Sequence, residues 1–593
     1  MKSNPFEFEE LEVKSPNGRI SFKVKLEEGK LVYWVEKDGE ILIEKSPMGI
    51  FTSVADFTRD LSLLSFSRRT IEERYPMIGR KKEIYENHCN ELVLKLGKKL
   101  SIMYLIMRAY NDGIAYRYHI PGEGELKISF ETSGFRIPQS AIGWAHPFTP
   151  KYEAFYPKRS YQELLEGNFG MPVLLNMKDN WLLLSEAAVY GDYCGSHIEG
   201  DKEKGLLKVV FAPDQKNVVV SKLPFYSPWR VAIIGFLADI VESTLIENLN
   251  PDCEIADTSW IKPGRSAWSW WSGDSTEDYE TQVKYVDFAH KMGWEYYLCD
   301  AGWKAEWLPK LVEYAREKGI GIFVWYHYKE VETDEDLHSK FSWLSRIGVK
   351  GVKVDFFDSD CQERIQMYDK VAKGALQYRL MVVYHGATKP SGERRRWPHI
   401  LTREGVLGAE YYKCSEGPTA EHNCTLPFTR NALGPMDYTP VTFSNMRNQT
   451  TYAHQLALAV VFESNIQHLA DKPEAYESIG EAIEFLKDCP ATWDDTKLLE
   501  GYPGRFVTIA RRSGDKWFIG AICGGGISRE AEISLEFLEE GREYIAEIYR
   551  DGNSPEEIIH ERKVVRKGDI LRIPLKTNGG CAIEIKTSAY TSL

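Results

Sequence analysis

The most constraining feature of this sequence is a series of apolar runs between residues 262 and 470 that alternate with helical stretches. Helical periodicity is clear in YETQVKYVDFAHKM (279–292) and WLPKLVEYAREK (307–318). Repeated strand–helix units of this length favour a parallel (β/α)8 barrel. An open doubly wound sheet is the alternative, but no glycine-rich phosphate loop follows any of these runs. The expected barrel strands are residues 266–271, 294–302, 321–328, 349–357, 380–387, 400–406 and 465–470, with the seventh strand guessed near 435–439.

The regions on either side of this block alternate at period two and are broken by turns such as NDG and DGE. This pattern, seen in LLKVVFAPD (206–214) and REYIAEIYRDG (542–552), predicts antiparallel strands. A chain of 593 residues has room for about three domains. We therefore expect a large N-terminal β-sandwich (1–260), a central barrel (261–490) and a small C-terminal β-sandwich (491–593).

Composition and charge exclude several classes of protein. The net charge is −13, no basic run is long, and the cluster GERRRWPH (392–399) is short, so we expect no nucleic-acid partner. No apolar run is long enough to span a membrane, and we expect no membrane partner. Ten cysteines without a CxxC pair argue against a zinc site or a dense disulfide scaffold. The start, MKSNPFEFEELEV, lacks the apolar core of a signal peptide, so we expect the cytoplasm, or the periplasm or secretion if a signal peptide has been removed.

Polar side chains stand where the expected strands end, and the chemistry of a (β/α)8 barrel gathers at that edge. Each one alone has a structural alternative, because a strand-end aspartate often caps a helix and a histidine often satisfies a backbone group. Their occurrence at strand after strand favours a functional site. These residues are Asp300, His327, Asp355, His385, Glu404, Glu410, His468 and Asp471.

The segment GVKGVKVDFFDSD (348–360) holds two charged residues, Lys353 and Asp355, on one face of a buried strand. Glycoside cleavage needs one carboxylic acid and a second carboxylate, and Glu404 and Glu410 close the strand after next. An ammonium beside Asp355 keeps that carboxylate ionised and can donate to a sugar hydroxyl. The alternative for Lys353 and Asp355 is a buried structural ion pair.

Five segments together resemble glycoside hydrolase family 97. The resemblance implies an N-terminal β-super-sandwich, a central (β/α)8 TIM barrel and a C-terminal all-β domain. The matching segments are LLSEAAVYGDY (183–193), GRSAWSWWSGD (264–274), WEYYLCDAGW (294–303), KGVKVDFFD (350–358) and YHGATKPSGERRRWPHILTREGVLGAEYYK (384–413).

Position 386 separates two branches of that family. Inverting members have a glutamate there and lack an aspartate at the end of strand four, whereas this sequence has Gly386 and Asp355. The resemblance to the retaining branch implies that Asp355 is the nucleophile and Glu410 the general acid/base. It also implies a calcium ion, whose ligands match Glu186, Glu404 and Glu410. Glu186 would bring part of the site from the N-terminal domain.

The retaining branch resembles α-galactosidases, which implies a carbohydrate substrate with terminal α-galactose. Predicted substrate-binding residues are Lys353, Asp300, Trp303, His327 and His385. An α-glucosidase, a β-L-arabinopyranosidase and a transglycosidase remain alternatives, as does a catalytically inactive carbohydrate-binding protein. A metal-dependent aldolase or amidohydrolase is a further alternative, but the H-x-H strand of an amidohydrolase is missing. We expect a monomer or a homodimer.

Overall fold

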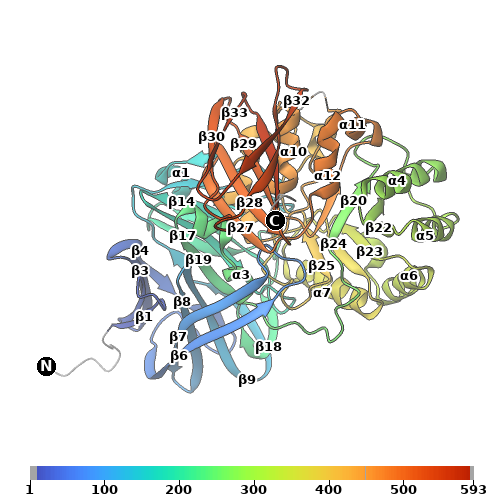
Figure 1. The fold of residues 1–593 in the computed structure, drawn as a ribbon. Coiled ribbons are helices and arrows are strands. Elements are labelled where there is room, and N and C mark those ends of the chain that lie inside the picture. The colour runs from blue at the N-terminus through green and yellow to red at the C-terminus, as the bar shows by residue number, and fades with distance from the viewer. Residues whose placement is uncertain (1–9, 446, 448, 588–593) are drawn as a thin grey trace.

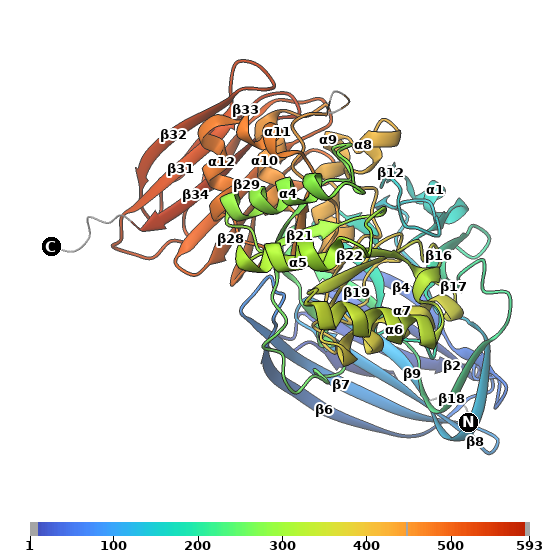
Figure 2. The same ribbon diagram turned by 90° about the vertical axis from the view of Figure 1, so that its right-hand side faces the viewer.

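The computed structural model describes residues 10–445, 447 and 449–587. It has a β-rich N-terminal part, a central part of parallel strands and helices, and an antiparallel C-terminal part, coloured blue to red in Figures 1 and 2. This arrangement confirms the predicted fold class. The predicted boundaries at 260 and 490 fall between α3 (Leu245–Asn248) and β20 (Gly264–Trp268), and between α12 (Ile483–Asp488) and β27 (Asp495–Tyr502). None of the helices in the described residues has the length and apolar character needed to cross a membrane.

The N-terminal part is built from three sheets, the largest with 11 strands. At its centre every residue of β19 is buried, and β19 pairs antiparallel with β15 and β9. The 11 strands are β12 (Lys158–Arg159), β11 (Ile142–Trp144), β14 (Val173–Met177), β15 (Asn180–Ala187), β19 (Trp229–Gly235), β9 (Gly113–Glu131), β8 (Ser101–Tyr110), β7 (Ile84–Lys98), β6 (Ser62–Pro76), β18 (Val219–Tyr226) and β5 (Ile50–Thr52). The two smaller sheets are β1 (Leu11–Lys14) to β4 (Glu40–Met48), and β10 (Gly134–Phe135), β17 (Leu206–Phe211), β16 (Ser196–Asp201) and β13 (Asn168–Phe169).

The central part is a nearly closed barrel of seven parallel strands in the order β25-β24-β23-β22-β21-β20-β26. The segment near 435–439, guessed as the seventh strand, forms no regular strand, but it makes an isolated parallel bridge to the end of β25, Arg403 to Met436. Pro435 lacks a backbone N–H, so it cannot contribute a ladder hydrogen bond there. The other strands are β21 (Tyr296–Cys299), β22 (Gly321–His327), β23 (Gly351–Asp355), β24 (Met381–Tyr384), β25 (Ile400–Arg403) and β26 (Ile466–Leu469).

Helices connect the strands of the barrel and lie on its outer face, side by side in Figure 2. The predicted helix at 279–292 is confirmed as α4 (Tyr279–Met292). Its N-terminus is capped by Asp278, and the left-handed residue Gly293 follows its last turn. The remaining helices of this face are α5 (Leu308–Glu317), α6 (Asp334–Ile347) and α7 (Gln362–Gln377). Since each returns the chain to the same end of the sheet, the carboxyl ends of the strands meet at one edge.

The C-terminal part has a six-stranded antiparallel sheet and a two-stranded one. Helix α10 (Tyr452–Val461) contacts β29 and β34 of the larger sheet and is buried on nearly every side. A helix that is apolar all round belongs between two layers, here the barrel and this sheet. The strands are β27, β28 (Phe506–Ser513), β29 (Lys516–Cys523), β34 (Gly580–Thr587), β31 (Tyr544–Asp551) and β32 (Ile558–Val565), then β30 (Arg529–Ser534) and β33 (Ile570–Leu575).

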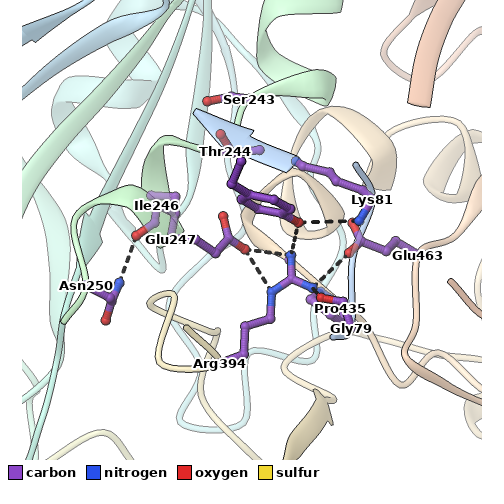
Figure 3. Close-up of polar contacts among 12 residues, drawn as sticks. Gly79, Lys81, Ser243, Thr244, Ile246, Glu247, Asn250, Arg394, Pro435 and Glu463 are labelled. Carbon is purple, nitrogen blue, oxygen red and sulfur yellow. Dashed lines mark hydrogen bonds and ion pairs between the residues drawn. The ribbon is translucent and has the colours of Figure 1, made fainter. Parts of the chain in front are cut away.

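A buried arginine joins the N-terminal part to the barrel (Figure 3). The guanidinium of Arg394 lies 2.7 Å from Glu247 of α3 and 3.1 Å from Glu463, which precedes β26. It also donates to the hydroxyl of Tyr85 and the carbonyl of Gly79. A buried charge satisfied on all sides fixes the geometry of its neighbours, because removal of any partner would leave an uncompensated charge.

The other two arginines of the same short run are also paired. Arg395 lies 2.7 Å from both Glu73 and Asp252, and Arg396 lies 2.8 Å from Glu254. The basic cluster therefore makes contacts between parts of the chain and is not a free cationic surface.

Candidate active site

Lys353 and Asp355 lie in β23, and both side chains are buried. The ammonium of Lys353 is 3.6 Å from Glu410, 3.7 Å from Asp437 and 3.9 Å from Asp300. Burial alone would lower the pKa of Lys353, but these three carboxylates raise it above its usual value. Lys353 is thus a fixed cation at the centre of the site, and Asp355 lies outside its close ion pairs.

Asp355 is held at both carboxylate oxygens. The backbone N–H of Phe356 donates to Oδ1 at 2.6 Å, and the indole N–H of Trp325 donates to Oδ2 at 2.9 Å. Burial opposes ionisation, but the charge of His385, 3.6 Å away, together with Lys353 and Trp325, lowers the pKa of Asp355 to about 2. The carboxylate is therefore ionised at neutral pH, which is the state that a nucleophile requires.

His385 lies between two further carboxylates, with Nδ1 3.1 Å from Glu404 and Nε2 3.0 Å from Glu410. Burial would lower the pKa of His385, but Glu404 and Glu410 raise it well above its usual value. Burial would raise the pKa of Glu410, but His385 and Lys353 outweigh it and lower that pKa. Burial and the charge of Glu153 raise the pKa of Glu404, in spite of His385. The pKa values of the two glutamates are therefore shifted in opposite directions although the carboxylates share one imidazole.

Asp437 is a buried carboxylate of the site that the sequence analysis missed. Its Oδ1 is 2.8 Å from Nδ1 of His468, and its Oδ2 is 3.6 Å from Nε2 of His385. Burial opposes ionisation, but His468 and Lys353 hold the pKa of Asp437 below its usual range. Asp437 lies within the segment 435–439, which the sequence analysis guessed to be a barrel strand. A polar residue in such a strand was the signal that could have identified it.

Two carboxylate oxygens of the cluster, Oε1 of Glu410 and Oδ2 of Asp437, are buried and accept no hydrogen bond of good geometry in the described part of the chain, although both lie in the ion pairs with Lys353 and His385. Buried polar atoms normally have partners, so such atoms point to a ligand. Asp300 is better satisfied, because it accepts from the indole of Trp268 at 2.7 Å and from the N–H of Ala301. Burial raises the pKa of Asp300.

Trp303 and His327 lie beside this cluster. The indole of Trp303 donates to the carbonyl of Trp325 at 2.8 Å, and its ring stacks at 6.3 Å on Trp343 of α6. Trp303 therefore lies between β22 and α6. The half-buried ring of His327 stacks on Phe356, with ring centres 5.2 Å apart. Neither of these two predicted binding residues bonds to the carboxylates, and the ring of Trp303 packs against Tyr326 and Trp343 in the layer between the barrel and α6.

Glu186, on β15, lies in a separate buried ion-pair network. It is 2.6 Å from Lys389 and 2.7 Å from Arg230, and it accepts from the N–H of Ser196. Burial would raise the pKa of Glu186, but Lys389 and Arg230 lower it. Both of its oxygens are used by these partners, and the structure does not group Glu186 with Glu404 and Glu410.

The N-terminal part reaches the site through another residue, Glu153, in the loop between β11 and β12. The hydroxyl of Tyr411, next to Glu410, donates to its carboxylate. Burial raises the pKa of Glu153, and the charge of Glu410 adds to that rise. No local sequence signal marks Glu153, because its partner lies 258 residues away.

Three of these side chains could hold a metal ion: ligand atoms of His385, Glu404 and Glu410 all lie within 4.8 Å of one another. Two of the three predicted calcium ligands are therefore brought together. Oε1 of Glu410 lies 3.0 Å from His385 and 3.6 Å from Lys353, so a cation bound to this oxygen would share it with two positive groups. Carboxylate oxygens suit Ca²⁺, whereas an imidazole is a more usual ligand of transition metals.

A parallel barrel whose strand ends carry an ionised aspartate and a nearby glutamate, flanked by two β domains, defines a glycoside hydrolase of a particular architecture. The chain belongs to glycoside hydrolase family 97. The model "Glycosyl-hydrolase 97 N-terminal" matches residues 13–251, "Glycoside hydrolase 97" residues 260–406, and "Glycosyl-hydrolase 97 C-terminal, oligomerisation" residues 492–586.

Similar proteins match along almost their whole length. A probable retaining alpha-galactosidase of Streptomyces bingchenggensis is 35% identical over 96% of this chain and 92% of its own. A retaining alpha-galactosidase of Bacteroides thetaiotaomicron is 28% identical over 96% of each chain. The crystal structure of a beta-arabinopyranosidase is 28% identical and superimposes with a TM-score of 0.90 over 97% of this chain and 100% of that one.

Proposed function

We propose that this protein is a retaining exo-α-galactosidase that acts by double displacement. The observation that carries the proposal is the position of Asp355: an ionised carboxylate at the end of β23 and Glu410 contact opposite nitrogens of one imidazole, that of His385. Retention requires such a pair, one carboxylate to attack and one to transfer the proton.

In the first step Asp355 attacks the anomeric carbon while the glycosidic C–O bond breaks and the leaving oxygen takes a proton from Glu410. In the second step Glu410 takes a proton from water, which attacks the same carbon and breaks the ester to Asp355. The free site lowers the pKa of Glu410. Bound substrate must therefore raise the pKa of Glu410 before the first step. Burial of the carboxyl beneath a bound sugar raises this pKa.

The sugar hydroxyls have several partners close to the anomeric carbon. Lys353 offers a donor, and Oδ2 of Asp437 and the carboxylate of Asp300 offer acceptors. Galactose is favoured because one relative is named as a probable retaining alpha-galactosidase and another as a retaining alpha-galactosidase. β-L-Arabinopyranose has the galactose ring arrangement without the exocyclic CH₂OH, and one similar structure is a beta-arabinopyranosidase.

A calcium ion is part of the proposal, with Glu404 and Glu410 as its ligands from the barrel. A bound cation would relieve the repulsion between these carboxylates and polarise an oxygen beside them. For Glu186 to join them, it would have to release Lys389.

The C-terminal domain supports a homodimer over a monomer, because its family model carries oligomerisation in its name. Light scattering of the purified chain tests this part of the proposal independently of activity.

A panel of nitrophenyl glycosides with and without chelator, followed by NMR of the first sugar released, tests the main proposal. We expect the α-galactoside to be hydrolysed fastest and the α anomer to appear first. A faster α-glucoside or β-L-arabinopyranoside would reassign the substrate, and a first product of β configuration would overturn retention. Sugar binding without turnover of any member would indicate a carbohydrate-binding protein.

A further inference from the structure

Phe356, directly after the nucleophile, combines two unusual properties. Its side chain is 42% exposed, although the residues on either side of it are buried. Its backbone has φ +65°, a left-handed conformation that costs a bulky residue free energy. A large apolar ring held at the site in a strained conformation, and left open to solvent, points to a role for the ring itself.

The surroundings of Phe356 form a flat, partly polar surface. The ring stacks on His327 at an interplanar angle of 18° and meets the edge of Trp325, with ring centres 6.2 Å apart. The ammonium of Lys151, from the N-terminal part, lies over the ring, 5.7 Å from its centre, on a side chain that is 43% exposed and can move aside. Lys151 is also 3.9 Å from Asp358, which gives the rim of this surface one donor and one acceptor.

The position of this surface relative to the buried cluster decides which part of a substrate it meets. Lys353, Asp300 and Asp437 are buried whereas Phe356 is exposed, so the three buried groups would contact the sugar that is cleaved off. In an exo-acting enzyme only the terminal sugar reaches such buried groups, so the remainder of the substrate must lie nearer to solvent. Phe356 directly follows the buried Asp355 and is itself exposed, so its ring lies on the solvent side of that carboxylate.

We propose that Phe356, backed by His327 and rimmed by Lys151 and Asp358, is the binding platform for the leaving group, and that this group is itself a pyranose. The apolar C–H face of a sugar packs on an aromatic face, while its hydroxyls need donors and acceptors at the edge. This inference rests on the proposed retaining hydrolysis and deepens it by naming the chemical class of the leaving group.

The test compares two substrates that share the terminal sugar, a galactosyl disaccharide and α-galactosyl fluoride, whose leaving group is one atom. Phe356→Ala should lower kcat/KM for the disaccharide about tenfold, the loss of one stacked aromatic contact. It should change kcat/KM for the fluoride less than about twofold, because a fluoride has no face to stack. Phe356→Tyr, which keeps the flat ring, should stay close to the wild type on both substrates, and Phe356→Leu should resemble Phe356→Ala.

Lys151→Ala provides a second line of evidence from another domain, and should lower kcat/KM for the disaccharide alone. Phe66→Ala is the matched control, because Phe66 is an exposed phenylalanine on β6, 50% open to solvent. It should leave both substrates unchanged.

Equal losses on the two substrates in Phe356→Ala would overturn the inference, since the ring would then act on Asp355 or on the terminal sugar. No loss on either would overturn it as well. If the wild type cleaves glucosyl but not galactosyl fluoride, the proposed substrate is wrong, yet the same comparison with a glucosyl disaccharide still tests the platform.

Discussion

A Cβ atom placed on Gly386 would lie 2.9 Å from Oδ1 of Asp355. The same atom would be 2.8 Å from the backbone nitrogen of Phe356, a distance that real Cβ atoms do not adopt. Gly386 also has φ +48°, and its N–H donates to Glu404 at 2.7 Å. A side chain at residue 386 and the carboxylate of Asp355 in its present position therefore exclude each other. This gives a physical reason why a glutamate at 386 and a nucleophilic aspartate at 355 are alternatives.

The first prediction follows from that contact. Gly386→Ala should displace Asp355 and lower kcat by about 100-fold, the usual effect of misplacing a reacting group by about 1 Å. Gly514→Ala is the control, because Gly514 also has a left-handed backbone, φ +59°, but a Cβ atom added to it would meet no atom within 4 Å. Gly514→Ala should lower the free energy of unfolding but leave kcat unchanged. Equal activity in the two variants would contradict the crowding argument.

The indole of Trp325 provides the second prediction. Trp325→Phe removes the hydrogen bond to Oδ2 of Asp355, and a bond to a charged group is worth about 1.5–3 kcal/mol, or about 10–100-fold in rate. The loss should appear in kcat for every substrate, since the nucleophile is common to all of them. Trp307→Phe removes an indole donor that binds the carbonyl of Glu277 instead, and should be close to the wild type. Steady-state kinetics on both variants checks this.

Variants that lack Asp355 and variants that lack Glu410 should lose activity in different ways. Asp355→Gly should lose turnover of all substrates, and azide entering the vacant space should give β-galactosyl azide. Glu410→Ala should lose about 10²–10⁴-fold on oligosaccharides but far less on nitrophenyl glycosides, which need little protonation. Azide should then give α-galactosyl azide. The anomers are distinguished by NMR, and the same anomer from both variants would sink the assignment of roles.

Chelation tests the metal site. Removal of calcium should lower activity, and added calcium should restore it better than magnesium, which demands a smaller octahedral site. Glu404→Gln should lower the calcium content found by elemental analysis, while its amide oxygen can still accept from Gly386. Full activity in a chelated preparation that contains no metal would refute this.

The pH dependence of stability should show the cost of burying an acid that takes no part in the proposed catalytic steps. Burial raises the pKa of Asp369 in α7 to about 6, although the N–H of Gly191 donates to it at 2.9 Å. The unfolded chain loses this proton near pH 4 and the folded chain near pH 6, so stability falls as pH rises between these values and is constant above.

Asp369→Asn removes this penalty and should raise the unfolding temperature at pH 7.5. At pH 4 the carboxyl is already protonated in the folded chain, so the variant should match the wild type there. Thermal unfolding at both pH values measures the difference. A stabilisation of the same size at pH 4 would show that the charge is not its source.

Local patterns predicted most of the fold, because strands and helices of the barrel depend on nearby residues. The helix at 279–292 has both its cap residues in the sequence, Asp278 and Gly293, and was found as predicted. The segment after Met436 has neither an alternating nor a helical pattern, so its position was only guessed and Asp437 was not singled out.

The sequence predicted only part of the site, because local patterns do not show contacts between distant residues. Residues that follow barrel strands meet automatically, which is why Asp355, His385, Glu404 and Glu410 were named together. Glu153 enters through a loop of another domain, and a lysine 203 residues away determines the surroundings of Glu186. Contacts across such separations leave no periodicity in the sequence.

The loop that carries Lys151 and Glu153 has a consequence for how enzymes of this kind diversify. Because it places a charge beside Glu410 and another beside Phe356, the N-terminal domain is part of the catalytic unit. Recombination that exchanges this domain between relatives would exchange site residues with it, and the buried pairing of Arg394 would have to be inherited at the same time. The whole chain, rather than the barrel alone, is therefore the unit on which selection for a new substrate can act.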